Sequence, residues 1–330
     1  MGKTKDEILY DENVKKFLSQ KYILAYILKY CVREFMNMEI PDIIPCIEGD
    51  PEISKSKVDA SLTHMDDFYD VKSIDGMNTE DASRDEGKVF FDIRFFVRFP
   101  REDELVKMFI NIEAQNEVEN LSYDIVTRGI YYCARMISSQ KQREFVKSEY
   151  EKIKKVYSIW VCTRCQEEYR KNTITSYSIN QTNVVGNYPD KDKYDLMTVV
   201  VIGLSEDVAS TSTEELKLHR LLETFFTSAL SKAEKRDIVE NEYQIPYTED
   251  IERSVEEMCN ASQGILNRGI EIGTEKGIEI GTEKGIEKGI EIGTIKGKVE
   301  AYHEIGMSAS EIAAKLNISE KEVNDIINSL

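Results

Sequence analysis

Histidine is scarce in this sequence: the 330 residues contain only three, His64, His219 and His303, each isolated from the others. The chain therefore lacks the residue pattern of a histidine-based catalytic triad or of a zinc protease. It also contains neither a Walker phosphate-binding loop nor a dinucleotide-binding glycine fingerprint. Chemistry driven by a bound nucleotide is not expected.

Cysteine and long apolar runs are also limited. Cys162 and Cys165 form a lone C-x-x-C without a second pair at zinc-ribbon spacing, so we expect incidental or buried thiols in a reduced, cytoplasmic protein. The first ten residues lack the apolar core of a secretory signal. The most apolar early run, 21–32, is short and interrupted by Lys29, which predicts a buried helix and no membrane span.

Basic residues are outnumbered, 43 against 61 acidic ones, and the net charge is −18. This balance argues against a protein that coats nucleic acid non-specifically, but it does not exclude a local basic groove. Residues 128–172 carry eleven basic and five acidic side chains, a local charge of +6. A phosphate-binding surface and an ordinary solvated helix face both explain this segment.

Periodic segments along the first 265 residues alternate between strand-like and helix-like patterns, which predicts a domain that contains both. We assign 1–265 to this domain. Helices are expected at 12–38, about 122–147, 212–230 and onward to about 263. Strands are expected at 88–99, 105–116, 156–162, 172–180 and 195–204.

Glycine occupies every fourth position from Gly269 to Gly297. Each interior glycine disfavours a helix by about 1 kcal/mol relative to alanine, so an isolated helix here is not expected to be stable. We assign 266–298 to a glycine-rich linker. Two alternatives remain open: a partly helical tether, and a helix whose small residues let a second copy of the chain approach closely.

The last segment, 299–330, is predicted to form a small helix-turn-helix-like tail. Ser308 with Glu311 and Ser319 with Glu322 are two capping boxes, and a turn is expected at Asn317. The second helix carries one lysine against three acids, which favours packing or homo-oligomer formation over DNA reading.

Polar residues accompany two apolar strands at 88–99 and 105–116. Placing both apolar faces on one side of the sheet requires paired residue numbers to sum to an odd number, about 205 or 203. Asp92 then faces Glu113 directly or diagonally, with Gln115 two residues farther on the same face. Two neighbouring carboxylates suit Mg²⁺, but a solvated face in which Arg94 neutralises the acids explains them too.

The order and spacing of Asp92 and "EAQ" at 113–115 resemble the core of the PD-(D/E)XK nuclease superfamily, in the Glu-x-Gln variant of its transposase family, the recombination-promoting nucleases. The likeness extends over "SYDIVTRGIYYCARMISSQ", "YEKIKKVYSIWV", the glycine repeat and "GMSASEIAAKLNIS". This resemblance implies a restriction-endonuclease-like α/β core, with a central mixed sheet flanked by helices, and a DNA endonuclease that depends on Mg²⁺ or Mn²⁺.

Carried over by position, Asp92 and Glu113 would hold the metal, and Glu48 would be a further ligand. Gln115 stands where the superfamily usually has lysine, which leaves three alternatives open: weak activity, use of a second metal, or recruitment of a nearby cation such as Arg94 or Lys107. The residues expected to bind DNA are Arg94, Arg128, Arg135, Lys141 and Arg143. Because two like charges repel, removing the carboxylate of Asp92 is expected to leave the metal-free protein equally stable or slightly more stable.

Two functions follow from the sequence. The first is a transposase-related, metal-dependent DNA endonuclease. The second is a DNA-associated or assembly protein that retains the nuclease fold and has weak or no activity. Gln115, the net acidity and the tail favour the second.

Overall fold

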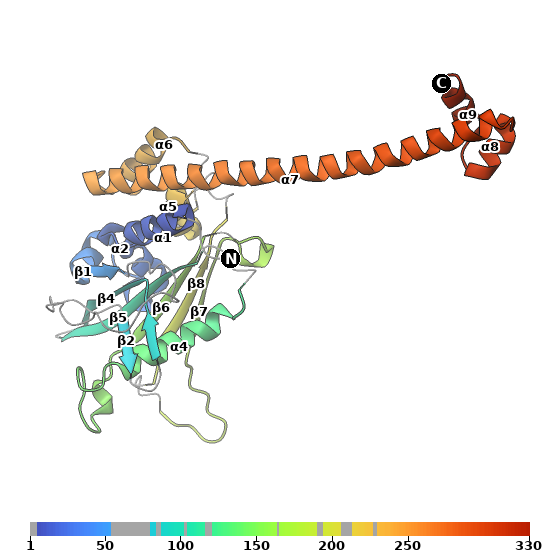
Figure 1. Cartoon of the computed structure of the whole chain (residues 1–330). Helices are drawn as coiled ribbons and strands as arrows, with labels where there is room; N and C mark the ends of the chain where they lie inside the picture. The colour runs from blue at the N-terminus through green and yellow to red at the C-terminus, as the bar shows by residue number, and fades with distance from the viewer. Residues whose placement is uncertain are drawn as a thin grey trace, which may run out of the picture. The chain divides into compact units, whose positions relative to one another are not determined.

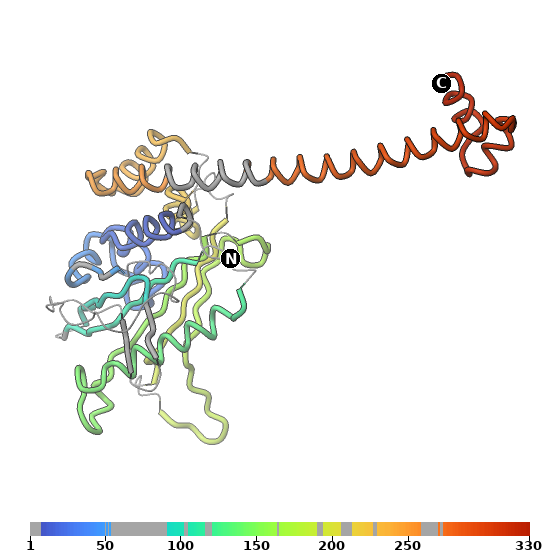
Figure 2. Tube along the Cα trace, in the orientation of Figure 1, coloured from blue at the N-terminus to red at the C-terminus, as the bar shows by residue number. Residues whose placement is uncertain are grey.

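The computed structural model describes the backbone of residues 5–53, 80–83, 87–101, 104–115, 121–163, 165–189, 194–205, 213–226 and 230–330 (Figure 1). It describes side chains over fewer residues, which are the coloured parts of the trace in Figure 2. The chain divides into two compact units, 1–265 and 266–330. None of the described helices is both long enough and apolar enough to cross a membrane.

The first unit is an α/β structure built on a six-stranded mixed sheet in the order β1-β4-β5-β6-β8-β7. The central strands β5, β6 and β8 are parallel, and the outer neighbours are antiparallel. Its strands are β1 (Ile47–Ile53), β4 (Ile93–Arg101), β5 (Glu104–Gln115), β6 (Val156–Cys162), β7 (Thr173–Ser178) and β8 (Met197–Gly203). A separate pair consists of β2 (Glu80–Ser83) and β3 (Gly87–Phe90).

Helices cover both faces of the six-stranded sheet (Figure 1). One face packs on α1 (Lys5–Leu18), α2 (Lys21–Cys31), α5 (Lys217–Phe226) and the start of α7 (Glu249–Glu304). The other packs on α4 (Ile125–Ser138), whose Gly129 lies so close to the sheet that a Cβ would be 2.5 Å from Val199 Cγ1. The other α-helices described in this unit are short: α3 (Ile40–Ile43) and α6 (Lys232–Asp237). A π-helical turn at Ile238–Glu242 follows α6.

The helix predicted over 12–38 is two helices, because the chain turns at Ser19 and Gln20 between α1 and α2. The helix predicted to about 147 ends at Ser138. Ser212, the predicted start of the next helix, lies outside the described residues. Cys162 and Cys165 are both buried, and neither forms a disulfide.

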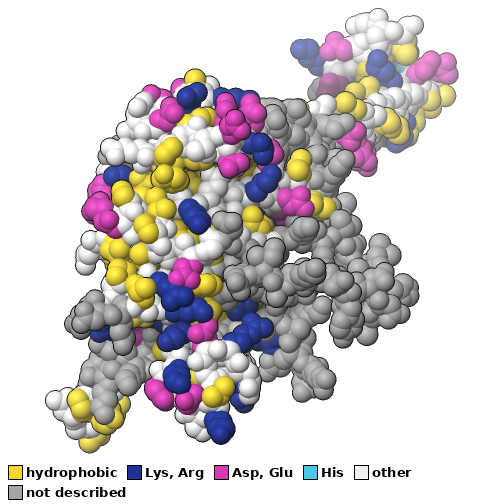
Figure 3. All heavy atoms as spheres, turned by 90° about the vertical axis from the view of Figure 1, so that its left-hand side faces the viewer, with side chains coloured by type: hydrophobic (Ala, Val, Ile, Leu, Met, Phe, Trp, Pro, Cys, Tyr) yellow, Lys and Arg dark blue, Asp and Glu magenta, His cyan; other side chains and the backbone are white. Residues whose placement is uncertain are grey.

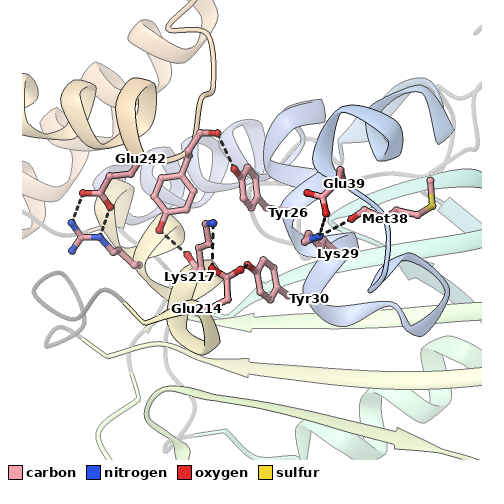
Figure 4. A network of polar contacts seen from close by, with 10 residues as sticks. Tyr26, Lys29, Tyr30, Met38, Glu39, Glu214, Lys217 and Glu242 are labelled. Carbon is pink, nitrogen blue, oxygen red and sulfur yellow. Dashed lines mark hydrogen bonds and ion pairs between the residues drawn. The ribbon is translucent and has the colours of Figure 1, made fainter.

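Tyrosine hydroxyls form hydrogen bonds between separate segments of the helix layer. Tyr26 donates to the Tyr243 carbonyl at 2.8 Å, and Tyr30 donates to Glu214 at 2.9 Å (Figure 4). Tyr243 in turn donates to the Lys217 carbonyl at 2.8 Å. These contacts connect α2 to the segment around α5 and surround a cavity of about 640 Å³.

In the second unit, the glycine repeat lies within the continuous helix α7, so the predicted linker is helical. Several of its isoleucines are exposed, among them Ile278 and Ile290 at 65% each. The tail forms α8 (Ala309–Leu316) and α9 (Glu320–Ile327). Both predicted capping boxes are present, and Asn317 adopts φ +55° between the two helices, so the C-terminal region is helical with a turn at Asn317.

Candidate functional site

The hairpin of β4 and β5 has the predicted register. Every pair from Ile93↔Ile112 to Arg101↔Glu104 sums to 205. The alternation of apolar residues determined this register. A slip of one residue would expose Ile93, Phe95 and Val97, which are all buried in the first core, the one between the sheet and the layer of α1, α2 and α5. The parity places Asp92, immediately before β4, opposite Glu113 near the end of β5.

The carboxylates of Asp92 and Glu113 each accept a hydrogen bond from a backbone N–H of the opposite segment. The Asp92 backbone N–H donates to Glu113 Oε1 at 3.0 Å, and the Ala114 N–H donates to Asp92 Oδ2 at 3.1 Å. Residue 92 lies in a bend, and Phe91 is buried in the core on the α4 side of the sheet, where its ring lies 5.2 Å from that of Tyr132. The bend thus brings the two carboxylates together at the carboxyl end of β5.

Glu113 is only 5% exposed. Burial, and next the neighbouring Asp92 carboxylate, raise its pKa well above the ordinary value of 4.5. Hydrogen bonds from the Asp92 N–H and Asn111 and the positive charge of Arg128 oppose this rise. A buried acid with a raised pKa is a frequent feature of functional sites, although structural networks also produce it.

Lys15, which the sequence analysis missed, completes the group. Its Nζ lies 2.7 Å from Asp92 Oδ1, and its side chain is only 9% exposed. Burial lowers the pKa of Lys15, but the Asp92 carboxylate more than offsets this effect, so the pKa lies above its ordinary value. A signal was available: Lys15 lies next to Val14 and three residues before Leu18, on the buried side of a predicted helix, where an unpaired lysine is rare.

Arg128 occupies the other side of the pair. Its guanidinium stacks on Tyr123 at 4.7 Å, Tyr132 at 5.1 Å and Trp160 at 5.4 Å, and it donates to both tyrosine hydroxyls. The Tyr123 hydroxyl also donates to Gln115 Oε1 at 3.4 Å. Tyr132 is buried.

The structure does not bring the other predicted residues to this site. Glu48 pairs with Phe96 in the sheet and forms an ion pair with Arg98, about 13 Å along β4 from Asp92 at the usual rise per residue. Lys107 forms an ion pair with Glu144 and lies about 20 Å along β5 from Glu113.

Two of the predicted DNA-binding arginines are buried. Arg94 is 2% exposed, with its guanidinium 4.8 Å from the Phe91 ring and a hydrogen bond to Ser139. Arg135 is 4% exposed. Neither guanidinium can contact DNA in this arrangement. The sequence did not reveal this burial, because it depends on how α4 packs on the sheet.

Lys141 and Arg143 are exposed, but the basic segment does not form one continuous positive surface. Lys152, Lys155, Arg170 and Lys171 all form ion pairs with nearby acids. On the face shown in Figure 3, Lys and Arg side chains gather in the lower half and are interspersed with Asp and Glu. Of the predicted cations, Arg128 is the one that lies beside the carboxylates.

The chemistry of the donor set permits a divalent cation. Mg²⁺ binds proteins through one or two carboxylates and completes its coordination with water and phosphate oxygens. Asp92 and Glu113 meet that minimum. Among the described residues no group of three acids, histidines or cysteines is placed to hold a metal, so an all-protein cage is not present there. The cavity beside Tyr26 and Tyr30 contains neither carboxylate.

The raised pKa of Glu113 predicts a pH-dependent stability. The folded protein binds this proton more tightly than the unfolded chain, so its stabilising contribution is complete below about pH 4.5 and is lost as pH rises through the raised pKa. In EDTA, the free energy of unfolding of wild type should fall relative to Glu113→Gln by up to about 1.4 kcal/mol per pH unit in this window. Urea unfolding at successive pH values measures this. Parallel curves for the two proteins would contradict the expectation.

Comparisons of the chain with protein-family models, with curated proteins and with solved structures found no match.

Proposed function

We propose that this protein is a metal-dependent DNA endonuclease with a restriction-endonuclease-like core, related to transposases. The observation that carries the proposal is the pairing of Asp92 with Glu113 at the carboxyl end of β5, which gives two adjacent carboxylates, one of them buried. The parallel strands β5, β6 and β8 and the helices on both faces agree with such a core.

In the proposed site Asp92 and Glu113 would hold Mg²⁺ or Mn²⁺. Such an ion supplies a Lewis acid for phosphodiester hydrolysis and lowers the pKa of a coordinated water. Gln115 presents a neutral amide on the same face, which can orient water or a phosphate oxygen but cannot balance charge. Arg128, fixed by three aromatic rings, places a positive charge beside Glu113 where the DNA backbone would approach.

One observation favours the second function, a nuclease fold without activity. Both Asp92 carboxylate oxygens and Oε1 of Glu113 already have a partner, either the Lys15 ammonium or a backbone N–H. A purely structural role for these two acids would require no metal. In that case the protein would associate with DNA or with other proteins without cleaving phosphodiester bonds.

Plasmid cleavage separates the two functions. Purified protein should nick or linearise supercoiled plasmid in millimolar Mg²⁺ or Mn²⁺ and should lose this activity in EDTA, because the carboxylates alone cannot polarise a phosphodiester. An active preparation that retains full activity in EDTA would contradict the metal-dependent proposal. Plasmid that is bound but remains intact in both metals would favour the inactive protein.

A further inference from the structure

The lysine that approaches the carboxylate pair comes from a helix, not from the strand that carries Glu113. Lys15 lies on α1, between Val14 and Leu18, which are buried in the first core at 2% and 0% exposure. This packing fixes the helix against the sheet. The Lys15 side chain then reaches Asp92 Oδ1 at 2.7 Å while Asp92 Oδ2 accepts the Ala114 N–H.

Strand β5 itself offers no charge at the corresponding place. Gln115 lies two residues beyond Glu113, and its amide oxygen accepts a hydrogen bond from the Tyr123 hydroxyl. Arg94 and Lys107, the cations nearest in sequence, interact elsewhere, Arg94 with Ser139 and Lys107 with Glu144. A buried ammonium is difficult to accommodate without a partner, so its place against Asp92 is a specific arrangement.

On the basis of the nuclease function proposed above, we propose that Lys15 is a positioning residue for that site. It fixes the orientation of Asp92 and balances one negative charge of the carboxylate pair. The positive charge also reduces the repulsion that a DNA phosphate meets when it approaches the two acids. Lys15 thereby substitutes from α1 for a lysine that β5 lacks.

If Lys15 has this role, its removal should strengthen metal binding and slow turnover. Without Lys15 the net charge of the site is one unit more negative, and no ammonium competes with the metal for Asp92 Oδ1. A divalent metal should therefore bind more tightly. Turnover should fall because Asp92 is no longer fixed and the phosphate meets greater repulsion. A residue that only supported the fold would, when removed, weaken both properties.

The experiment compares Lys15→Met and Lys15→Arg with wild type. Methionine retains much of the buried side-chain volume, and arginine retains the charge. Lys16→Met is the matched control, because Lys16 is the next residue on α1 and pairs with Glu257 at 3.0 Å, away from the carboxylates. Mn²⁺ affinity is measured by calorimetry without DNA, and kcat and KM by plasmid cleavage.

For Lys15→Met we expect a Kd for Mn²⁺ about tenfold lower than that of wild type and a kcat at least about tenfold lower. Lys15→Arg should retain part of the activity, and adding Gln115→Lys to Lys15→Met should restore part of it. Lys16→Met should match wild type in both measurements. Unchanged or weaker Mn²⁺ binding by Lys15→Met would overturn the role of Lys15.

Asp92→Asn distinguishes this failure from failure of the nuclease proposal. If Asp92→Asn loses Mn²⁺ binding and cleavage while Lys15→Met behaves like wild type, the site stands and the role of Lys15 is wrong. If Asp92→Asn binds Mn²⁺ and cleaves like wild type, or wild type does neither, both proposals fail.

Discussion

Asp92→Asn should reduce plasmid cleavage on the order of 1,000-fold or more, equivalent to about 4 kcal/mol of transition-state stabilisation. Asparagine can still accept the Ala114 N–H, so the hairpin is retained, but the site loses one of two anionic ligands. Wild type should gain melting temperature in millimolar Mn²⁺ by mass action, and the variant should lose most of that gain.

The structure changes one expectation for this variant. The sequence predicted that removing a like charge would leave the metal-free protein equally stable or more stable. Lys15 reverses the sign, because its buried ammonium would lose the partner that lies 2.7 Å away. We now expect a loss of about 1–3 kcal/mol in the free energy of unfolding in EDTA.

Asp195→Asn is the matched control for the Asp92 variant. Asp195 pairs with Lys155 at the same 2.7 Å, and its side chain is 17% exposed against 18% for Asp92. Its loss should lower stability less, because Lys155 retains Glu34 at 3.2 Å. Cleavage and the response to Mn²⁺ should be unchanged. Equal loss of cleavage in both variants would show that destabilisation, and not the site, explains the effect.

Gly203→Ala should be among the most destabilising single changes in the sheet. An added Cβ would lie 1.9 Å from the Arg170 carbonyl oxygen and 3.1 Å from Thr173 Oγ1. The first contact involves backbone, so β8 or the segment around Arg170 must move. We expect a loss of about 3 kcal/mol or more in the free energy of unfolding, measured by urea titration.

Gly273→Ala is the matched control for the glycine substitution. No heavy atom beyond its own helix lies within 4 Å of the position that its Cβ would occupy in α7. Alanine should favour that helix by about 1 kcal/mol and leave the first unit unaffected. A Gly203→Ala protein as stable as wild type to within about 0.5 kcal/mol would contradict the close approach of the two backbones.

The register of the hairpin follows from local patterns, and so it was predictable. Alternation along β4 and β5 determines which residues face each core, and this alone placed Asp92 opposite Glu113. The caps at Ser308 and Ser319 were equally local, because each depends on a glutamate three residues later.

The surroundings of the carboxylates depend on contacts between distant segments, and the sequence could not determine them. Lys15 reaches Asp92 only because α1 ends at Leu18 and packs on the sheet. Arg94 on β4 and Arg135 on α4 are buried, although their charge suggested a surface. Lys155 of the basic segment pairs with Glu34 and Asp195, which lie far from it in sequence.

The most direct test of the proposed site is a crystal soaked in Mn²⁺ and measured at the manganese absorption edge. The account predicts an anomalous peak bound by carboxylate oxygens of both Asp92 and Glu113, and no such peak in Asp92→Asn. A wild-type crystal with full manganese exposure, no peak at this pair and the Lys15–Asp92 contact intact would contradict it.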